Sequence, residues 1–223
     1  VICPVLFGFM FMTDSMKNIF EKLGGIEDVT TKFAGFVLCA LMFLTAITTT
    51  SNKLASTGFS REGSNWMHMK YIPVPMEKQI LAKTLPGFVV NVLITLVFFL
   101  GGGFVLVTRM GFDVLVIVSG CVLMLGASWL MTCVGAWCES RNPKVDWGND
   151  GDVNPKALKS VGGEMRSLLV GFVYATLPLL VTPLVKFDPL VFMPVLAVVG
   201  VAVAVVSGSM LLAAAARNLE AFE

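Results

Sequence analysis

The sequence predicts an all-α, multi-pass membrane protein with about six transmembrane helices, and two observations lead to this fold class. The chain of 223 residues is 56% hydrophobic and 14% charged, whereas about 25% of the residues in a soluble domain carry charge. Its apolar residues also come in long blocks, and a helix needs about 20 of them to cross a bilayer. Barrel strands would be short and alternating, so we predict one helical transmembrane domain over residues 1–223.

The expected spans follow the apolar blocks in chain order. Val1 opens inside an apolar run, so we expect upstream sequence to complete a first, partial span. Short connections at 109–113 and 186–188 make the spans on either side of them antiparallel neighbours. The six expected spans cover residues 1–12 (partial), 33–50, 84–107, 114–138, 167–185 and 189–216.

The connection after the first span contains a predicted short helix. Asp14 or Ser15 can cap its N-terminus, and Gly24-Gly25 can end it. Its apolar residues fall on one face, which suits a helix lying on the membrane surface. Packing against the ends of the spans fits the same pattern equally well.

The placement of Lys and Arg predicts the orientation. Segments 51–83 and 139–166 each contain five of them, and Arg217 follows the last span. The connections on the opposite side contain five in total, against eleven. Cytoplasmic loops of membrane proteins carry the excess of Lys and Arg. We therefore place both long segments, and both chain ends, in the cytoplasm.

The expected spans contain few polar or ionisable side chains. No ionisable residue lies near the centre of an expected span, and the strongest polar group at depth is Asn91. We expect Asn91 to hydrogen-bond a neighbouring helix, with a place along a substrate path as the alternative. The cysteines are expected to be packing residues, and His68 has no metal-ligating partners at useful spacing. We predict no enzymatic activity, no cofactor and no metal, and a net charge of +1 gives no reason to expect nucleic-acid binding.

Segment 51–83 is more elaborate than a plain connector. Ser60 can cap a short helix over 61–70, which Pro73 and Pro75 then stop. A second amphipathic stretch, 77–83, leads into the next span. Aromatic and basic residues on the short helix fit two roles. It can float among lipid headgroups, or it can dock into a groove of a cytoplasmic partner.

Two short motifs lie in the two predicted cytoplasmic segments. The first is a Ser-Arg-Glu-Gly run followed by an aromatic residue, a Lys, a Pro-Val element and a second Lys. It is formed by Ser60, Arg61, Glu62, Gly63, Trp66, Lys70, Pro73, Val74 and Lys83. The second is similar to a Pro-Lys-Leu-Asp-Trp element and is formed by Pro143, Lys144, Val145, Asp146 and Trp147. Together the two motifs resemble those of bacterial ABC-type exporter permeases of the type-2 class.

The resemblance implies a multi-pass permease of the bacterial inner (cytoplasmic) membrane, with this chain as its C-terminal half. Residues 60–70 would be a coupling helix that contacts a separate ABC ATPase subunit, which agrees with the absence of a phosphate-binding loop here. A second permease half, identical or not, would complete the path across the bilayer. Two other readings fit the sequence. They are an ATPase-independent transporter or channel, and a structural membrane protein with an interfacial anchor helix.

Overall fold

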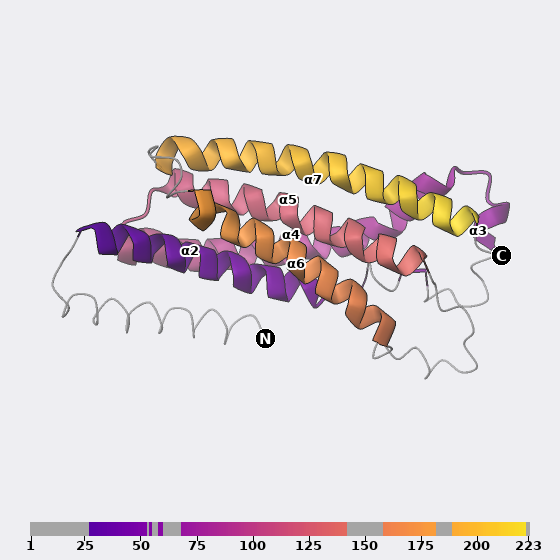
Figure 1. The fold of residues 1–223 in the computed structure, drawn as a ribbon, viewed down its shortest axis with the longest axis horizontal. Helices are drawn as coiled ribbons and strands as arrows, with labels where there is room; N and C mark the ends of the chain where they lie inside the picture. The colour runs from indigo at the N-terminus through magenta and orange to yellow at the C-terminus, as the bar shows by residue number, and fades with distance from the viewer. Residues whose placement is uncertain are drawn as a thin grey trace.

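The computed structural model describes residues 27–52, 54, 58–59, 68–141, 158–181 and 189–221, and all regular structure within them is helical (Figure 1). This confirms the predicted all-α class for the described part of the chain. The predicted partial span 1–12 and the short helix after it lie outside these residues. The helices are α2 Glu27–Thr50, α3 His68–Tyr71, α4 Met76–Met110, α5 Val114–Ser140, α6 Leu158–Val181 and α7 Pro189–Glu220.

Among the described residues, three helices are long and apolar enough to cross a membrane. These stretches are Met76–Thr108 in α4, Val114–Ser140 in α5 and Leu190–Glu220 in α7. A shorter apolar helical stretch, Leu38–Thr50, belongs to α2. The chain therefore has the composition and helix lengths of a membrane protein, whereas the number of spans and their orientation stay predictions.

Several helices extend past the apolar blocks that predicted them. α4 begins at Met76, although the apolar block begins at residue 84. Residues 77–83 consist of strong helix formers, so the helix continues through them at little cost. α6 likewise begins at Leu158, inside the segment 139–166 that was predicted to be a loop. The apolar block marks the part that suits lipid, and not the whole helix.

Helix α5 forms the centre of the bundle. It packs against α2, α4, α6 and α7, and its broadest contact is with α7. Within the most apolar stretch of each helix, 61% is buried in α5, but only 22% is buried in α7. The outer faces of α4 and α7 leave apolar side chains exposed, including Leu93, Leu100 and Val198. Lipid or another membrane helix can cover such faces at no cost.

Glycines of α7 lie close against side chains of α5. A Cβ atom on Gly208 would lie 2.5 Å from Nε1 of Trp129, and one on Gly200 would collide with Leu123. Gly102 in α4 fits against Leu41 of α2 in the same way. Small residues at such crossings let the backbones come together in a membrane, where dispersion contacts replace the hydrophobic effect.

Helices α4 and α5 form a tight antiparallel hairpin. Gly111 ends α4 in the left-handed conformation, with φ of 69°. Its backbone N–H and that of Phe112 both donate to the carbonyl of Leu106. Residues 111–113 connect Met110, the last residue of α4, to Val114, the first residue of α5. The short connection predicted at 109–113 therefore adopts a glycine cap of the kind that ends many helices.

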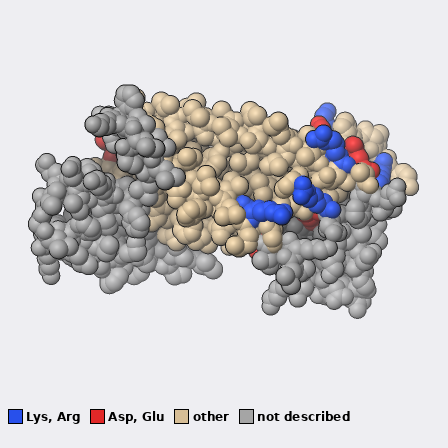
Figure 2. All heavy atoms as spheres, in the orientation of Figure 1, with Lys and Arg blue, Asp and Glu red and all other residues tan. Residues whose placement is uncertain are grey.

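The cations whose side chains are described gather toward one end of the bundle (Figure 2). That end combines the starts of α4 and α6 with the ends of α2, α5 and α7. The cations there are Lys70, Lys78, Lys83, Arg141, Arg166 and Arg217.

Candidate functional site

The predicted partner-contact residues divide between described and undescribed parts of the chain. Lys70 and Pro73 are described, and both are exposed to solvent. Helix α3, which ends at Tyr71 just before the two prolines, is the last part of the helix predicted over 61–70. The remaining predicted contact residues lie outside the described residues; they are Ser60, Arg61, Glu62, Gly63, Trp66, Lys144, Asp146 and Trp147.

The segment that follows α2 touches the bundle at two points, which we name the polar anchor and the apolar anchor. The polar anchor is Asn52 with Asn91 and Thr132. The apolar anchor is Phe59 and Met69 with the buried side chains around them. Those side chains come from the start of α4 and the ends of α5 and α7, and they are Met76, Ile80, Cys133, Ala136, Leu212, Ala215, Ala216 and Leu219.

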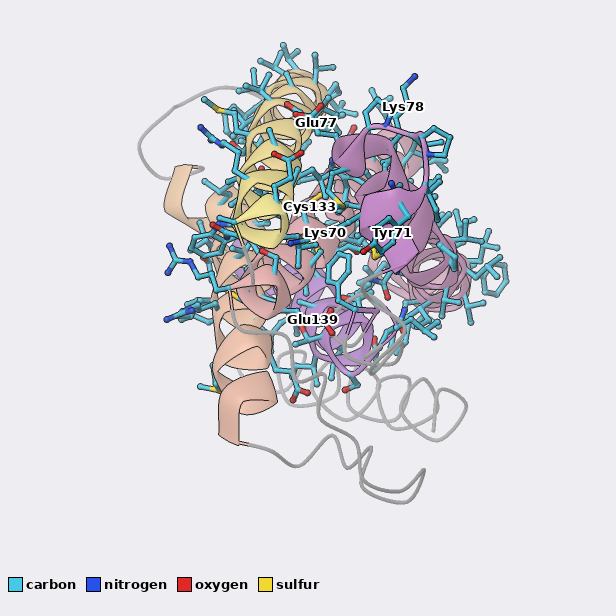
Figure 3. All side chains as sticks on the ribbon, turned by 90° about the vertical axis from the view of Figure 1, so that its right-hand side faces the viewer. Lys70, Tyr71, Glu77, Lys78, Cys133 and Glu139 are labelled. Carbon is cyan, nitrogen blue, oxygen red and sulfur yellow. The ribbon has the colours of Figure 1, made fainter. Side chains whose placement is uncertain are left out.

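The apolar anchor inserts two side chains of the segment between three helix ends. Phe59 is 3% exposed and Met69 is 6% exposed. Figure 3 views the bundle from this end, with α3 beside the start of α4, and labels Cys133 and Glu139 of α5. Cys133 is fully buried in the anchor, which is the packing role expected of the cysteines. Burying a Phe side chain contributes about 1.5–3 kcal/mol where the alternative is water.

Polar contacts fix the backbone of the segment beside the apolar anchor. The N–H of Phe59 donates to Oε1 of Glu139 at 3.1 Å. Gln79 of α4 donates to the carbonyls of Met69 and Val74, at 3.1 and 2.7 Å. These bonds join the segment to both α4 and α5. The segment is therefore held in one position, and not only covered by apolar contact.

Lys83 of α4 lies against the same two inserted side chains. Its Nζ is 2.9 Å from Sδ of Met69 and 5.5 Å from the ring centroid of Phe59. An ammonium at that distance over an aromatic face is attracted by the ring. The Lys that the sequence placed at the entry to the span thus contacts the segment directly.

An exposed apolar edge lies next to the apolar anchor. Tyr71 is 83% exposed, and Ile72 and Val74 are 48% and 43% exposed. Lys70 and Lys78 flank them in the sequence and are exposed too (Figure 3). The segment therefore buries one set of apolar side chains and presents another set outward.

The polar anchor links the end of α2 to α4 and α5. Nδ2 of Asn52 donates to the Gly87 carbonyl and to Oδ1 of Asn91, both at 2.9 Å. Asn91 in turn donates to the Thr132 hydroxyl at 3.1 Å and is 4% exposed. Asn91 therefore makes the interhelical hydrogen bond that the sequence favoured, and α2 is tied to it through Asn52.

A small cavity adjoins the polar anchor. The space open to a water molecule is about 20 Å³, which is enough for one or two small species. Helices α2, α4, α5 and α6 and the residues just after α2 supply its walls. The lining residues are Thr49, Thr50, Asn52, Asn91, Met131, Thr132, Gly135, Glu164 and Ser167. Asn91 thus lines a cavity as well as bonding a neighbour, but the cavity is far too small for an exporter's substrate.

Sequence reasoning missed most of this cavity. Glu164 falls in the predicted loop 139–166, whereas the structure places it one turn before Ser167 in α6. The spacing of three residues, which puts both on one helix face, was the available signal. The run of threonines before Asn52 was a second signal, since membrane helices use such side chains to contact one another.

The described residues form an all-helical bundle with three membrane-length helices, and the two anchors join described residues after α2 to that bundle. Among the described residues, no group of three or more His, Cys, Asp or Glu side chains could hold a metal ion. Comparison of the chain with family models, curated proteins and solved structures gives no match. Any functional assignment therefore depends on the residues themselves.

Proposed function

We propose that this chain is the membrane-spanning permease subunit of an ATP-driven ABC exporter, with ATP hydrolysed on a separate subunit. One observation carries the proposal: Phe59 and Met69 of segment 51–83 are buried against the start of α4 and the ends of α5 and α7 at the apolar anchor. A plain connector would need neither the buried Phe59 nor the bond from its N–H to Glu139. The two motifs that resemble type-2 exporter permeases support the same function.

The apolar anchor gives a physical route for coupling. Protein interiors are packed as densely as organic crystals and transmit displacement instead of absorbing it. A push on the segment would therefore move the start of α4 and the ends of α5 and α7 together. The polar anchor extends this connection to α2, because Asn52 bonds both the Gly87 carbonyl and Asn91. The exposed edge of Tyr71, Ile72 and Val74 supplies apolar surface beside the proposed contact helix.

The proposal includes a complete topology. The cationic end of the bundle faces the cytoplasm, in accord with the rule that places Lys and Arg there. Six spans and both chain ends on the cytoplasmic side complete the arrangement. A second permease half, either another copy or a different chain, packs on the exposed apolar faces of α4 and α7 within the inner membrane.

The decisive experiment combines co-purification with mutation of the contact helix. In mild detergent, a stoichiometric partner with a phosphate-binding loop is expected to co-purify. Glu62→Arg and Trp66→Ala are each expected to lower transport-coupled ATPase activity several-fold, with normal insertion into the membrane. Glu220→Arg is the control for charge reversal, since Glu220 is exposed at the end of α7. Unchanged coupling in both contact-helix variants would show that this helix does not transmit the motion.

The cavity with Glu164 favours a second candidate, an ATPase-independent transporter. An ionisable side chain that lines a cavity between membrane helices is a common feature of ion and proton pathways. Reconstituted protein that transports without ATP, and that purifies without a nucleotide-binding partner, would replace the ABC assignment with this one.

A further inference from the structure

We propose that the end of α5 and the adjoining part of α6 bind the phosphate of an acidic phospholipid, with Arg141 and Arg166 as its cationic ligands. Arg141 is the residue that follows α5, and Arg166 lies in the third turn of α6. Both side chains are exposed, at the cationic end of the bundle (Figure 2). The site requires a membrane, but it does not depend on ATP-driven export.

A contact with α5 holds each of the two guanidinium groups. The guanidinium of Arg141 lies over the ring of Trp137, with its central carbon 4.0 Å from the ring centroid. Nη1 of Arg166 donates to Sγ of Cys138 at 3.6 Å. Trp137 and Cys138 lie one turn before Arg141, and residues three or four apart share a helix face. Both cations are therefore positioned on the same face at the end of α5.

The carboxylates closest to the two arginines in the sequence belong to other contacts. Glu139 precedes Arg141 by two residues and accepts from the N–H of Phe59 at the apolar anchor. Glu164 precedes Arg166 by two residues and lines the cavity at the polar anchor. Side chains two residues apart on a helix do not face each other. Within the described part of the chain, neither guanidinium forms an ion pair with a carboxylate.

The depth of the pair matches the phosphate level of a bilayer. The sequence predicts spans over 114–138 and 167–185. Arg141 follows the first of these by three residues, and Arg166 immediately precedes the second. Trp137 belongs to a residue type that is enriched where membrane meets water. In the proposed topology, the two cations therefore lie among the headgroups of the cytoplasmic leaflet.

An exposed apolar stripe on α6 begins at the same place. Met165, Leu169, Phe172 and Val173 are all exposed, and their spacing puts them on one helix face. Arg166 precedes Leu169 by three residues and Val173 by seven, so it lies on the edge of that face. A lipid can place its phosphate at the arginines and its acyl chains along the stripe. A small anion or a nucleotide would leave the stripe without contact.

The charge of the pair favours an acidic phospholipid over a zwitterionic one. A guanidinium is always protonated, and its planar fork can bond two phosphate oxygens at once. Two such groups attract a headgroup with net negative charge, whereas the ammonium of a zwitterionic headgroup is repelled. Basic sites between transmembrane helices on the cytoplasmic side are known to bind acidic headgroups.

Native mass spectrometry of the purified full chain tests the site. The chain is titrated in micelles with phosphatidylglycerol, or with phosphatidylcholine of the same acyl chains, and is then released from the detergent. We expect saturable retention of phosphatidylglycerol and weaker retention of phosphatidylcholine. Equal retention of the two lipids would overturn the proposal. Displacement of phosphatidylglycerol by millimolar inorganic phosphate would also overturn it, because a free anion would then occupy the site.

Variants of the two arginines locate the effect. Arg141→Gln and Arg166→Gln each remove one cation and should weaken retention of phosphatidylglycerol about fivefold. Lys78→Gln is the matched control, since Lys78 is an exposed cation of α4 on the side of the bundle away from α6 (Figure 3). An equal loss in Lys78→Gln would mean general attraction to positive charge and would overturn the site. Native retention in both arginine variants would overturn it as well.

Two charge-preserving variants cover the case in which the Gln variants fail to fold. Arg141→Lys and Arg166→Lys keep the positive charge, but an ammonium lacks the fork that bonds two phosphate oxygens. Retention of phosphatidylglycerol should therefore be weaker in both variants than in the native chain. Undiminished retention in both would show that the guanidinium groups are not the phosphate ligands.

Discussion

The polar anchor and the apolar anchor hold the same segment by different forces. At the polar anchor, Asn52 is held by hydrogen bonds to α4 and, through Asn91, to α5. At the apolar anchor, Phe59 and Met69 are held mainly by burial among apolar side chains. In the proposed topology, the Asn91–Thr132 bond of the polar anchor lies within the spans 84–107 and 114–138, and the apolar anchor lies at the cytoplasmic end.

The surroundings explain the difference. Lipid tails are as apolar as leucine, so burying an apolar side chain between helices in a bilayer gains little from the hydrophobic effect. Hydrogen bonds between helices give specific attachment there. At the end of the bundle the competing environment is water, and burial of Phe59 is favourable. The polar anchor should therefore set the position of the segment, and the apolar anchor should supply most of its binding free energy.

Of the three substitutions at the anchors, Phe59→Ala should have the largest effect on stability. Truncation of a buried Phe costs about 3–5 kcal/mol, so the variant should lose protection of segment 51–83 in hydrogen exchange and lower the melting temperature. Tyr71→Ala is the matched control, because Tyr71 is an aromatic residue of the same segment that is 83% exposed. Equal effects of the two substitutions would contradict the dominant role of the apolar anchor.

Asn91→Ala should have a smaller effect on stability. Interhelical hydrogen bonds in membrane proteins contribute about 0.6–1.7 kcal/mol, and this change removes the acceptor of Asn52 and the donor to Thr132. Thermal unfolding of Asn91→Ala, Thr132→Val and the double variant measures the coupling between the two side chains. Strictly additive losses would show that the bond does not contribute.

Lys83→Gln should have the smallest effect of the three. A partly buried cation–aromatic contact contributes roughly 1 kcal/mol, and part-buried Lys83 lies 5.5 Å from the Phe59 ring centroid. Lys83→Arg is expected to retain most of the stability, since it preserves the charge. The melting temperatures of the two variants measure the contribution of the Lys83 charge to stability. A Gln variant as stable as the Arg variant would exclude such a contribution.

The sequence was sufficient for the helical class and for the positions of α4, α5 and α7, because uninterrupted apolar blocks of that length leave few alternatives. Asn91 was recognisable as a polar residue at depth, but Thr132 and Asn52 were not recognisable as its partners. Those contacts depend on helix rotation, which generic apolar helices do not reveal. Glu164 was placed in a loop because polarity masks a helix that continues beyond its apolar block.

The segment of the predicted coupling helix shows which contacts could not be predicted from the sequence. The two prolines were expected to stop it, and the four-residue helix α3 ends at Tyr71, but residues 61–67 of the predicted helix lie outside the described residues. The burial of Phe59 could not be anticipated, since nothing in a mixed polar and apolar segment says which aromatic residue turns inward. The contact with Glu139, distant in the sequence, depended on the packing of the whole bundle.

The hydrogen bonds within α2 bear on how the chain enters the membrane during synthesis. Thr45, Thr49 and Thr50 each donate to a carbonyl of their own helix. In the proposed topology, this helix can therefore enter lipid with these hydroxyl protons already satisfied. Asn91 depends on Thr132 of the following helix, so α4 and α5 are expected to partition into lipid together. The three-residue turn at Gly111 makes such a pair a single unit of insertion.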